Sequence, residues 1–285
     1  MSPTALHGRR IAITGAGRGI GLATAKSLHQ QGATIVIGDL DIETATAAAD
    51  IVGPGTHAYP VDVSNYESFA AFHKQATADA PLDVLINNAG IMPIGGFLEQ
   101  SADTHRRAVE INVMGCINGM QLALPAMTER GSGHIINIAS SAGKTPVPGG
   151  LTYCGTKAAV IALTETARVE FAGTGVRVNC VMPTFTNTEL IVGTNAQGAT
   201  KPVQPEDIAA AVIATLDKPK TIVSVPYPLR FMAIGIALLP PRARRWVSKA
   251  MGTDRVFLDL DNTARASYER RARAATGLIE TSEKP

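Results

Sequence analysis

The sequence lacks long hydrophobic runs and long runs of charge of one sign. Its longest apolar stretch near the C-terminus, residues 231–239, is about half of the roughly 20 residues that a membrane-spanning helix requires. The first ten residues are polar and contain no pattern of a secretory signal. The formal net charge of +2 gives no reason to expect nucleic acid as a partner. We therefore expect a cytoplasmic protein that neither spans a membrane nor binds nucleic acid.

Cysteine is also scarce. Cys116, Cys154 and Cys180 form an odd, widely separated set without the spacing of metal ligands. A chain of this kind is typical of a reducing compartment, and we expect no metal site. By contrast, apolar residues make up 45% of the chain and its mean hydropathy is positive. The composition therefore allows a substantial hydrophobic core.

Short β-type runs alternate with helical stretches along most of the chain. The expected strands are residues 11–14, 34–37, 57–59, 84–86, 134–138, 177–181 and 222–225. Such alternation predicts a parallel sheet with helices on both faces. We expect one α/β domain over residues 1–285, in which residues 8–225 form a doubly wound, seven-stranded core. Residues 226–285 would add a helical extension that covers a pocket or forms an interface.

A glycine-rich turn follows the first expected strand directly. The segment Thr14–Gly21 reads T-G-x-x-x-G-x-G, and a helix is expected to begin near Leu22. The strict G-x-G-x-x-G pattern is not met, because Ile20 occupies the sixth position counted from Gly15. Glycines let the backbone approach a pyrophosphate, and a helix N-terminus offers free N–H groups and a positive dipole end. The segment therefore predicts a phosphate-binding turn.

Tyr153 and Lys157 are one helical turn apart, so their side chains can lie on the same face of a helix. A nearby ammonium group favours the ionised phenol, and we expect Lys157 to lower the pKa of Tyr153 toward the range of an acid/base catalyst. The pair by itself is weak evidence, because ordinary surface helices often contain this spacing. A serine pair, Ser140-Ser141, lies shortly upstream and could polarise a carbonyl oxygen.

In this combination the sequence resembles the short-chain dehydrogenase/reductase family, over roughly residues 8–225. Further matching segments follow in family order: Asp62-Val63, Asn87-Asn88-Ala89-Gly90, Asn112 and residues 135–140. The resemblance implies a Rossmann-type fold and hydride transfer between a nicotinamide coenzyme and an alcohol or carbonyl compound. It also implies that Tyr153 transfers the proton, acting as the base in oxidation and the acid in reduction.

The resemblance assigns residues to two groups. The family spacing selects Ser140 over Ser141, so that the catalytic set is Asn112, Ser140, Tyr153 and Lys157, although Asn112 read alone would more often be structural. The residues implied for coenzyme binding are Gly15, Gly17, Arg18, Gly19, Ile20, Gly21, Asp39, Leu40, Asp62, Val63, Asn87, Ala89, Gly90, Tyr153, Lys157, Pro183, Thr186 and Thr188.

Asp39 follows the second expected strand, near the spacing at which an acidic group binds the adenine ribose. Its carboxylate would accept hydrogen bonds from the ribose hydroxyls and repel a 2′-phosphate, so NAD(H) is expected rather than NADP(H). The alternative role is that of a helix N-cap, for which Asp41 competes. Arg18 leaves a phosphate-binding alternative open.

One position departs from the family pattern. After the sixth expected strand the family usually has Pro-Gly, whereas this chain has Pro183-Thr184. Unlike glycine, threonine does not readily adopt a positive φ, and its side chain adds bulk beside the nicotinamide. Thr188 still matches the threonine that typically contacts the nicotinamide carboxamide or phosphate. We expect coenzyme binding to persist and the floor of the pocket to differ.

Apolar residues flank the expected active site. Met92, Pro148 and Phe185 are expected to contact substrate together with Ser140 and Tyr153, which favours a lipophilic alcohol or ketone. The same residues could instead be core or interface. Within the family, the long tail resembles those of retinol, steroid or fatty-alcohol dehydrogenases. Residues 229–239, followed by basic residues and Trp246, also permit contact with a membrane surface, although a helix that closes the pocket is preferred.

Other functions remain open at this point. The resemblance implies a homodimer or homotetramer that pairs the helices near residues 104–129 and 153–173. The fold alone would also permit a non-catalytic NAD-binding redox sensor or scaffold. An epimerase or dehydratase of related fold is a further alternative. The complete set of Asn112, Ser140, Tyr153 and Lys157 favours the dehydrogenase.

Overall fold

The computed structural model describes residues 6–194, 202–227, 235, 239–250 and 252–274. Within these residues, seven parallel strands form a sheet in the order β3-β2-β1-β4-β5-β6-β7. The strands are β1 (Arg10–Thr14), β2 (Thr34–Asp39), β3 (His57–Pro60), β4 (Val84–Asn87), β5 (Gly133–Ile138), β6 (Val176–Pro183) and β7 (Ile222–Val225). The predicted doubly wound sheet and its seven strands are confirmed, with ends that differ by at most a few residues.

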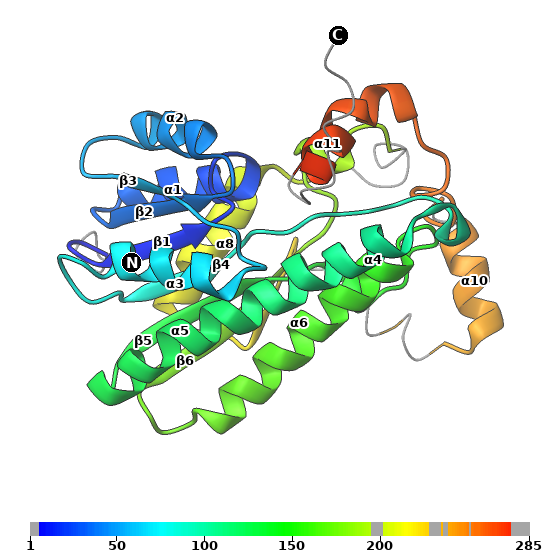
Figure 1. Ribbon diagram of the computed structural model, residues 1–285. Coiled ribbons are helices and arrows are strands. Elements are labelled where there is room, and N and C mark those ends of the chain that lie inside the picture. Colours follow the sequence, from blue (N-terminus) through cyan, green and yellow to red (C-terminus); the bar gives the residue numbers. More distant parts are fainter. Residues whose placement is uncertain (1–5, 195–201, 228–234, 236–238, 251, 275–285) are drawn as a thin grey trace, which may run out of the picture.

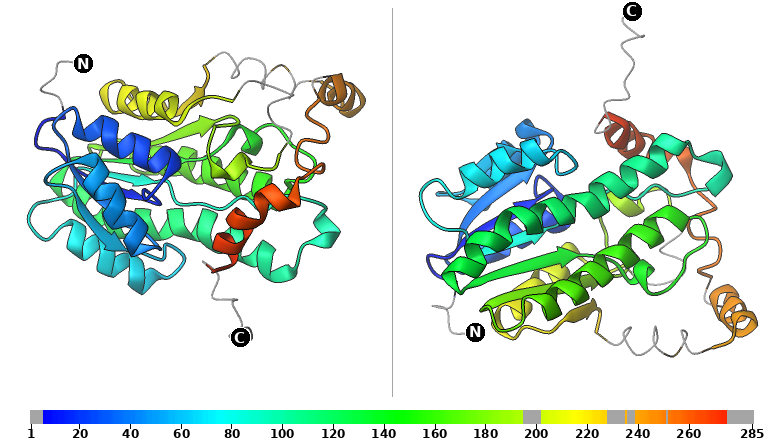
Figure 2. Two further views of the ribbon diagram at one scale, coloured as in Figure 1. Left: turned by 90° about the horizontal axis from the view of Figure 1, so that it is seen from above. Right: turned by 60° about the horizontal axis from the view of Figure 1, so that its bottom comes forward.

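Helices cover both faces of this sheet (Figures 1 and 2). One face carries α1 (Gly19–His29), α2 (Ile42–Val52) and α8 (Pro205–Asp217). The opposite face carries α3 (Tyr66–Ala76), α5 (Gly115–Arg130) and α6 (Leu151–Glu170). Side chains along a strand alternate between the faces, so Ile11 and Ile13 lie in the first core whereas Ala12 lies in the second. This double burial explains why the strands are almost continuously apolar.

A π-helical turn, η2 (Glu110–Met114), joins α4 (Ala102–Val109) to α5. The helix expected near residues 104–129 is therefore interrupted by an irregular turn. Turns of this type often occur at functional sites. The turn carries Asn112, which is 1% exposed.

The chain reverses its winding direction between β1 and β4, which are neighbours in the sheet. In sheets of this type, ligands bind in the crevice outside the carboxyl ends of the strands at that position. Three short turns lie near this edge: η1 (Phe97–Glu99), η3 (Ser141–Gly143) and η4 (Glu189–Ile191).

The C-terminal extension contains two helices, α10 (Pro241–Ala250) and α11 (Asn262–Ala274). In Figure 1, α11 lies over the carboxyl edge of the sheet, and α10 lies to the side of the molecule. None of the described helices is long and apolar enough to cross a membrane. Most of the apolar segment at residues 229–239 lies outside the described residues.

Candidate active site

A cavity of about 1420 Å³ runs along the carboxyl edge of the sheet, from the glycine-rich turn to the C-terminal extension. It brings together most of the residues that the sequence analysis singled out. Those that line it are Gly15, Arg18, Gly19, Ile20, Asp39, Leu40, Asp62, Val63, Ala89, Gly90, Met92, Ser140, Pro148, Tyr153, Lys157, Pro183, Phe185, Thr186 and Thr188. Gly17, Gly21, Asn87 and Asn112 lie outside this lining.

The glycine-rich turn is tightly packed. Gly19 has a φ of +56°, a conformation that favours glycine. A Cβ atom on Gly21 would lie 2.6 Å from the carbonyl oxygen of Gly15, so the helix start could not come this close to the turn with a larger residue. The side chain of Asn88 donates hydrogen bonds to the carbonyl oxygens of Thr14 and Gly15, both at 2.9 Å. The turn is thus held from the end of β4.

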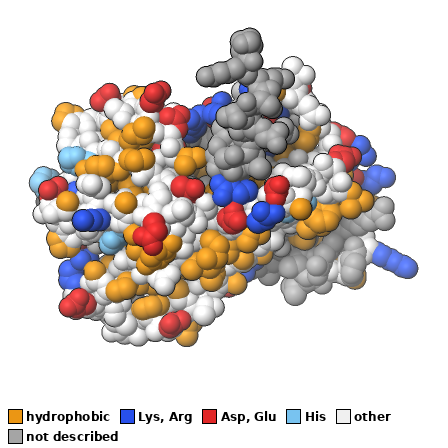
Figure 3. Space-filling view, in the orientation of Figure 1, with side chains coloured by type: hydrophobic (Ala, Val, Ile, Leu, Met, Phe, Trp, Pro, Cys, Tyr) orange, Lys and Arg blue, Asp and Glu red, His pale blue; other side chains and the backbone are white. Residues whose placement is uncertain are grey.

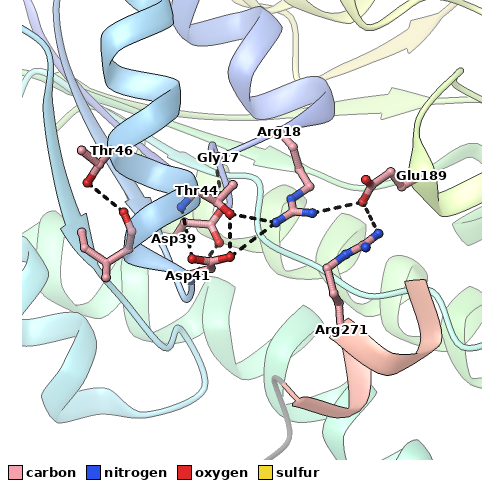
Figure 4. Close-up of polar contacts among 9 residues, drawn as sticks. Gly17, Arg18, Asp39, Asp41, Thr44, Thr46, Glu189 and Arg271 are labelled. Atoms are coloured by element: carbon pink, nitrogen blue, oxygen red, sulfur yellow. Dashed lines mark hydrogen bonds and ion pairs between the residues drawn. The ribbon is translucent and has the colours of Figure 1, made fainter. Parts of the chain in front are cut away.

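Asp39 and Asp41 have separate roles at the end of β2 (Figure 4). Asp41 is the N-cap of α2 and accepts a hydrogen bond from the backbone N–H of Thr44 at 3.1 Å. The Asp39 carboxylate instead accepts the Gly17 N–H at 2.9 Å and lines the cavity. The competition between the two aspartates for the N-cap position is therefore resolved in favour of Asp41.

Four charged residues of the cavity lining form an ion-pair bridge (Figure 4). Arg18 lies 3.8 Å from the Asp41 carboxylate and 3.4 Å from the Glu189 carboxylate, measured between nitrogen and oxygen atoms. Arg271, on α11, contacts the same Glu189 oxygen at 2.7 Å. The bridge of Asp41, Arg18, Glu189 and Arg271 thus connects α2, the glycine-rich turn, η4 and the C-terminal extension.

Tyr153, Lys157 and Ser140 converge in the middle of the cavity, and all three are buried. Tyr153 and Lys157 lie on the same face of α6, and the Lys157 ammonium is 5.9 Å from the centre of the tyrosine ring. Lys157 also donates a hydrogen bond to the carbonyl oxygen of Ile138 at 2.9 Å. Ser140 is the N-cap of η3, two residues after the end of β5, and its hydroxyl accepts a hydrogen bond from the Ala142 N–H at 3.2 Å.

The pKa of Tyr153 shifts in the direction opposite to the expectation. Burial raises this pKa because the ionised phenolate loses hydration, while a hydrogen bond with Ser140 opposes the shift. Burial likewise lowers the pKa of Lys157. The expected lowering of the Tyr153 pKa by Lys157 was therefore wrong. Tyr153 keeps its proton at neutral pH.

Asn112 holds the loop after β4 against α6 from behind the cavity wall. Its side-chain oxygen accepts the Ile91 N–H at 2.8 Å. Its amide nitrogen donates to the Ile91 carbonyl at 2.9 Å and to the Thr156 hydroxyl at 3.0 Å. Thr156 directly precedes Lys157 on α6. The amide of Asn112 thus fixes the loop relative to the helix that carries Tyr153 and Lys157.

The loop after β6 extends toward the glycine-rich turn. A Cβ atom on Gly19 would lie 3.4 Å from the Thr188 methyl group, which shows how closely the two segments approach. Thr186 is buried, and its hydroxyl donates to the carbonyl oxygen of Thr184 at 3.0 Å. No described residue other than glycine has a positive φ. Thr184 therefore occupies the usual glycine position without backbone strain.

Comparisons with known proteins agree with this arrangement of the sheet, the glycine-rich turn and the residues around Tyr153. The family model described as short chain dehydrogenase matches residues 9–198. The chain belongs to the short-chain dehydrogenase/reductase family. Its seven-stranded parallel sheet is the Rossmann-type fold that the resemblance predicted.

Relatives and solved structures give the same result. The chain is 34% identical to an uncharacterized oxidoreductase of Staphylococcus aureus (strain USA300), over 77% of this chain and 95% of the relative. It is 32% identical to the probable oxidoreductase EphD of Mycobacterium tuberculosis, over 82% of this chain. The chain spans less than half of EphD, since the match covers 44% of that protein.

Two similar solved structures contain a coenzyme. A 3-ketoacyl-(acyl-carrier-protein) reductase from Brucella melitensis, complexed with NADH, has a TM-score of 0.71 at 27% identity and covers 77% of this chain and 97% of its own. A short-chain dehydrogenase/reductase from Burkholderia phymatum, in complex with NAD, has a TM-score of 0.73 at 25% identity and covers 80% and 92%.

Asn87 is placed away from the cavity in this family member. It is buried, and its amide donates to the side-chain oxygen of Asn137 at 2.8 Å. Asn137 in turn donates to the Thr164 hydroxyl at 2.9 Å. Asn87 thus links β4 to β5 and α6, while its neighbour Asn88 contacts the glycine-rich turn. The resemblance had assigned Asn87 to coenzyme binding, whereas the structure places Asn88 in the cavity lining and Asn87 outside it.

The C-terminal extension supplies wall residues that the sequence analysis missed. Phe257, Leu258 and Tyr268 line the cavity. Phe257 packs edge-on against Phe185, with ring centres 5.7 Å apart. Arg265 is almost fully buried beneath this wall. These residues lie beyond the last strand, where no motif with a fixed spacing applies, and only the aromatic residues near the tail offered a signal.

Proposed function

We propose that this protein is an NAD(H)-dependent oxidoreductase that interconverts a lipophilic alcohol and its ketone or aldehyde, with Tyr153 as general acid and base. The observation that carries this proposal is the single continuous cavity that joins the glycine-rich turn to Tyr153, Ser140 and Lys157. The close packing of Gly21 against Gly15 and the position of the turn on the cavity wall fit a dinucleotide. When bound, the nicotinamide coenzyme would supply or accept the hydride.

The chain's own residues would donate and accept the proton. Tyr153 is protonated at neutral pH and is therefore ready to donate to a carbonyl oxygen in the direction of reduction. In oxidation it would accept the same proton. The Ser140 hydroxyl, which is hydrogen-bonded to Tyr153, would stabilise the charge that develops on the substrate oxygen. Lys157 would hold a positive charge behind the phenol and contact the nicotinamide ribose.

Electrostatics at the adenine end support NAD(H) over NADP(H). Asp39 places a carboxylate on the cavity wall, where it would accept hydrogen bonds from the ribose hydroxyls and repel a 2′-phosphate. Arg18, the cation that could bind such a phosphate, already contacts Asp41, Thr44 and Glu189. A 2′-phosphate would have to compete with two carboxylates for this guanidinium group.

The substrate end of the cavity favours a lipophilic molecule. Met92, Pro148 and Phe185 line it, as do residues that the tail and η4 supply. Buried apolar surface stabilises binding by about 25 cal/mol per Å², which favours a hydrophobic carbon skeleton over a sugar. The apolar side chains that line this end are Met92, Val147, Phe185, Leu190, Ile191 and Phe257, and Ile94, Val256 and Leu260 belong to the same hydrophobic cluster.

We further propose that the protein forms a homo-oligomer through the outer faces of α4, α5 and α6. Val109, Met114 and Val169 are large exposed hydrophobic residues on these elements and η2. Figure 3 shows hydrophobic side chains gathered on the molecular surface over α4 and α5. Light scattering on the purified protein tests this proposal, and a monomer at micromolar concentration would refute it.

The catalytic proposal is tested by steady-state turnover. Purified protein would be incubated with NADH or NADPH and a series of ketones of increasing chain length, and the absorbance of the reduced coenzyme would be followed. We expect turnover with NADH that increases with the apolar length of the substrate. Binding of NADH without turnover of any ketone would instead support the non-catalytic sensor, and turnover confined to polar sugars would refute the lipophilic substrate.

A further inference from the structure

Tyr268, on α11, lies in the wall of the same cavity as Tyr153. Its side chain is buried, with 8% exposure. The phenol oxygen accepts a hydrogen bond from the backbone N–H of Met92 at 2.8 Å. The two tyrosines are near enough for Tyr268 to contribute to the raised pKa of Tyr153. The C-terminal extension thus places a second phenol beside the catalytic one.

The proton of the Tyr268 hydroxyl is not used within the described part of the chain. A phenol carries one donor and can also accept hydrogen bonds. The phenol oxygen accepts a hydrogen bond from the Met92 N–H, but no described residue accepts one from the hydroxyl proton. A buried donor that lacks a partner is costly, so such groups usually bind a ligand or a water molecule. The unused proton belongs to a group that lines the cavity.

Arg265 holds Tyr268 in this position. Its guanidinium carbon lies 4.4 Å from the centre of the Tyr268 ring. The guanidinium donates to the carbonyl oxygens of Met92 at 2.7 Å, Leu190 at 2.8 Å and Val192 at 3.2 Å. It also forms an ion pair with Glu269 at 2.7 Å. Because Arg265 is only 1% exposed and bonded on all sides, it positions Tyr268 and does not itself face the cavity.

The surroundings define what the phenol can bind. Met92 and Leu190, on the loops that Arg265 joins, present apolar side chains to this end of the cavity. The charge of Arg265 is compensated by Glu269, so this wall carries no free positive charge from that pair. A phenol in such a place suits a neutral acceptor oxygen better than a carboxylate.

We propose that Tyr268 is a specificity-determining residue that donates a hydrogen bond to a second, neutral oxygen of the substrate. The substrate class is then a lipophilic ketone or alcohol with a further keto, ester or ether oxygen remote from the reacting carbon. This inference rests on the proposed function and narrows it. A site built to donate a hydrogen bond also discriminates against a substrate that lacks the acceptor, because the buried donor then stays unpaired.

The test uses pairs of ketones of equal length, in which one member carries an additional carbonyl group at successive positions along its chain. For the wild-type enzyme with NADH, we expect at least one position of the second carbonyl to raise kcat/KM by roughly three- to tenfold over the plain ketone. Tyr268→Phe should remove this advantage, so that the two members of the pair have nearly equal kcat/KM values. Tyr66→Phe is the matched control, because Tyr66 is an exposed phenol on α3.

Each outcome has a distinct meaning. A wild-type enzyme that turns over both members of every pair equally would overturn the inference, whether or not the variant folds. A loss in Tyr268→Phe that is equal for both members would also overturn it, because that pattern indicates only a structural role through Met92. Absence of turnover for all ketones would refute the proposed function itself.

Discussion

The two ends of the cavity are constructed in different ways. At the coenzyme end, the contacts join the ends of neighbouring strands, as when the Gly17 N–H beside β1 is bound by Asp39 at the end of β2. At the substrate end, a side chain from the tail joins loops that are distant in the sequence. Arg265 contacts the Met92 carbonyl, which lies 173 residues earlier in the chain.

This difference separates what is general in the family from what is particular to this chain. The coenzyme end depends on backbone geometry that the sheet imposes, so many sequences with the same glycine spacing can build it. The substrate end depends on one buried guanidinium group and the aromatic residues around it. We expect mutations at the two ends to change different kinetic constants, and the following predictions use that expectation.

The largest effect is expected at Tyr153, where the two ends meet. Tyr153→Phe removes the proton that must reach the substrate oxygen, while the ring keeps its packing in the buried site. Turnover should fall by about 10²- to 10⁴-fold, the usual contribution of general acid catalysis. The dissociation constant for NADH, measured by fluorescence titration, should stay within about twofold. A variant with near-normal turnover would refute the assignment of Tyr153.

Arg265→Met should disturb the substrate end alone. Three backbone carbonyls lose their buried donor, and each loss costs about 1 to 3 kcal/mol. We expect α11 to detach locally, with a rise in KM for lipophilic ketones of roughly tenfold or more and faster hydrogen exchange in residues 254–274. The affinity for NADH should change little, because the glycine-rich turn is held from β4.

Arg270→Met is the matched control for this variant. Arg270 is exposed on the same helix, five positions after Arg265. Its replacement should leave KM and hydrogen exchange near their wild-type values. Equal effects of the two substitutions, or an unchanged KM in Arg265→Met, would show that the buried guanidinium does not hold the substrate end.

The difference between the two ends also explains which features of the structure could be predicted from the sequence. The seven strands and the glycine-rich turn follow from apolar runs and short spacings, which depend on local geometry, and the structure agrees with them. The direction of the Tyr153 pKa shift did not follow, because it depends on burial that packing from distant segments creates. Arg265 and Tyr268 were missed for the same reason. A charged residue in a polar helix gives no sequence signal of burial.

At the adenine end, Asp39→Asn should shift coenzyme preference. The amide oxygen can still accept the Gly17 N–H, so the turn should keep its shape, while the negative charge is lost. We expect the ratio of kcat/KM for NADH over NADPH to fall by roughly tenfold. Asp50→Asn is the control, since it removes an exposed carboxylate on α2 that is not part of the cavity lining. An equal shift in both variants would show that Asp39 does not select the coenzyme by its position.

The smallest effect is expected at Glu189, which links the two ends through the ion-pair bridge. Glu189→Gln would weaken its contacts with Arg18 and Arg271, but these side chains are 38% and 42% exposed and Glu189 is 45% exposed. Exposed ion pairs contribute about 0 to 1 kcal/mol, so NADH should dissociate at most about fivefold faster in stopped-flow experiments. Salt near 1 M should bring the wild-type rate close to that of the variant, because it screens the same charges. If neither the substitution nor salt changes the dissociation rate, the bridge does not retain the coenzyme. The C-terminal extension would then be held over the cavity by the contacts of Arg265 alone.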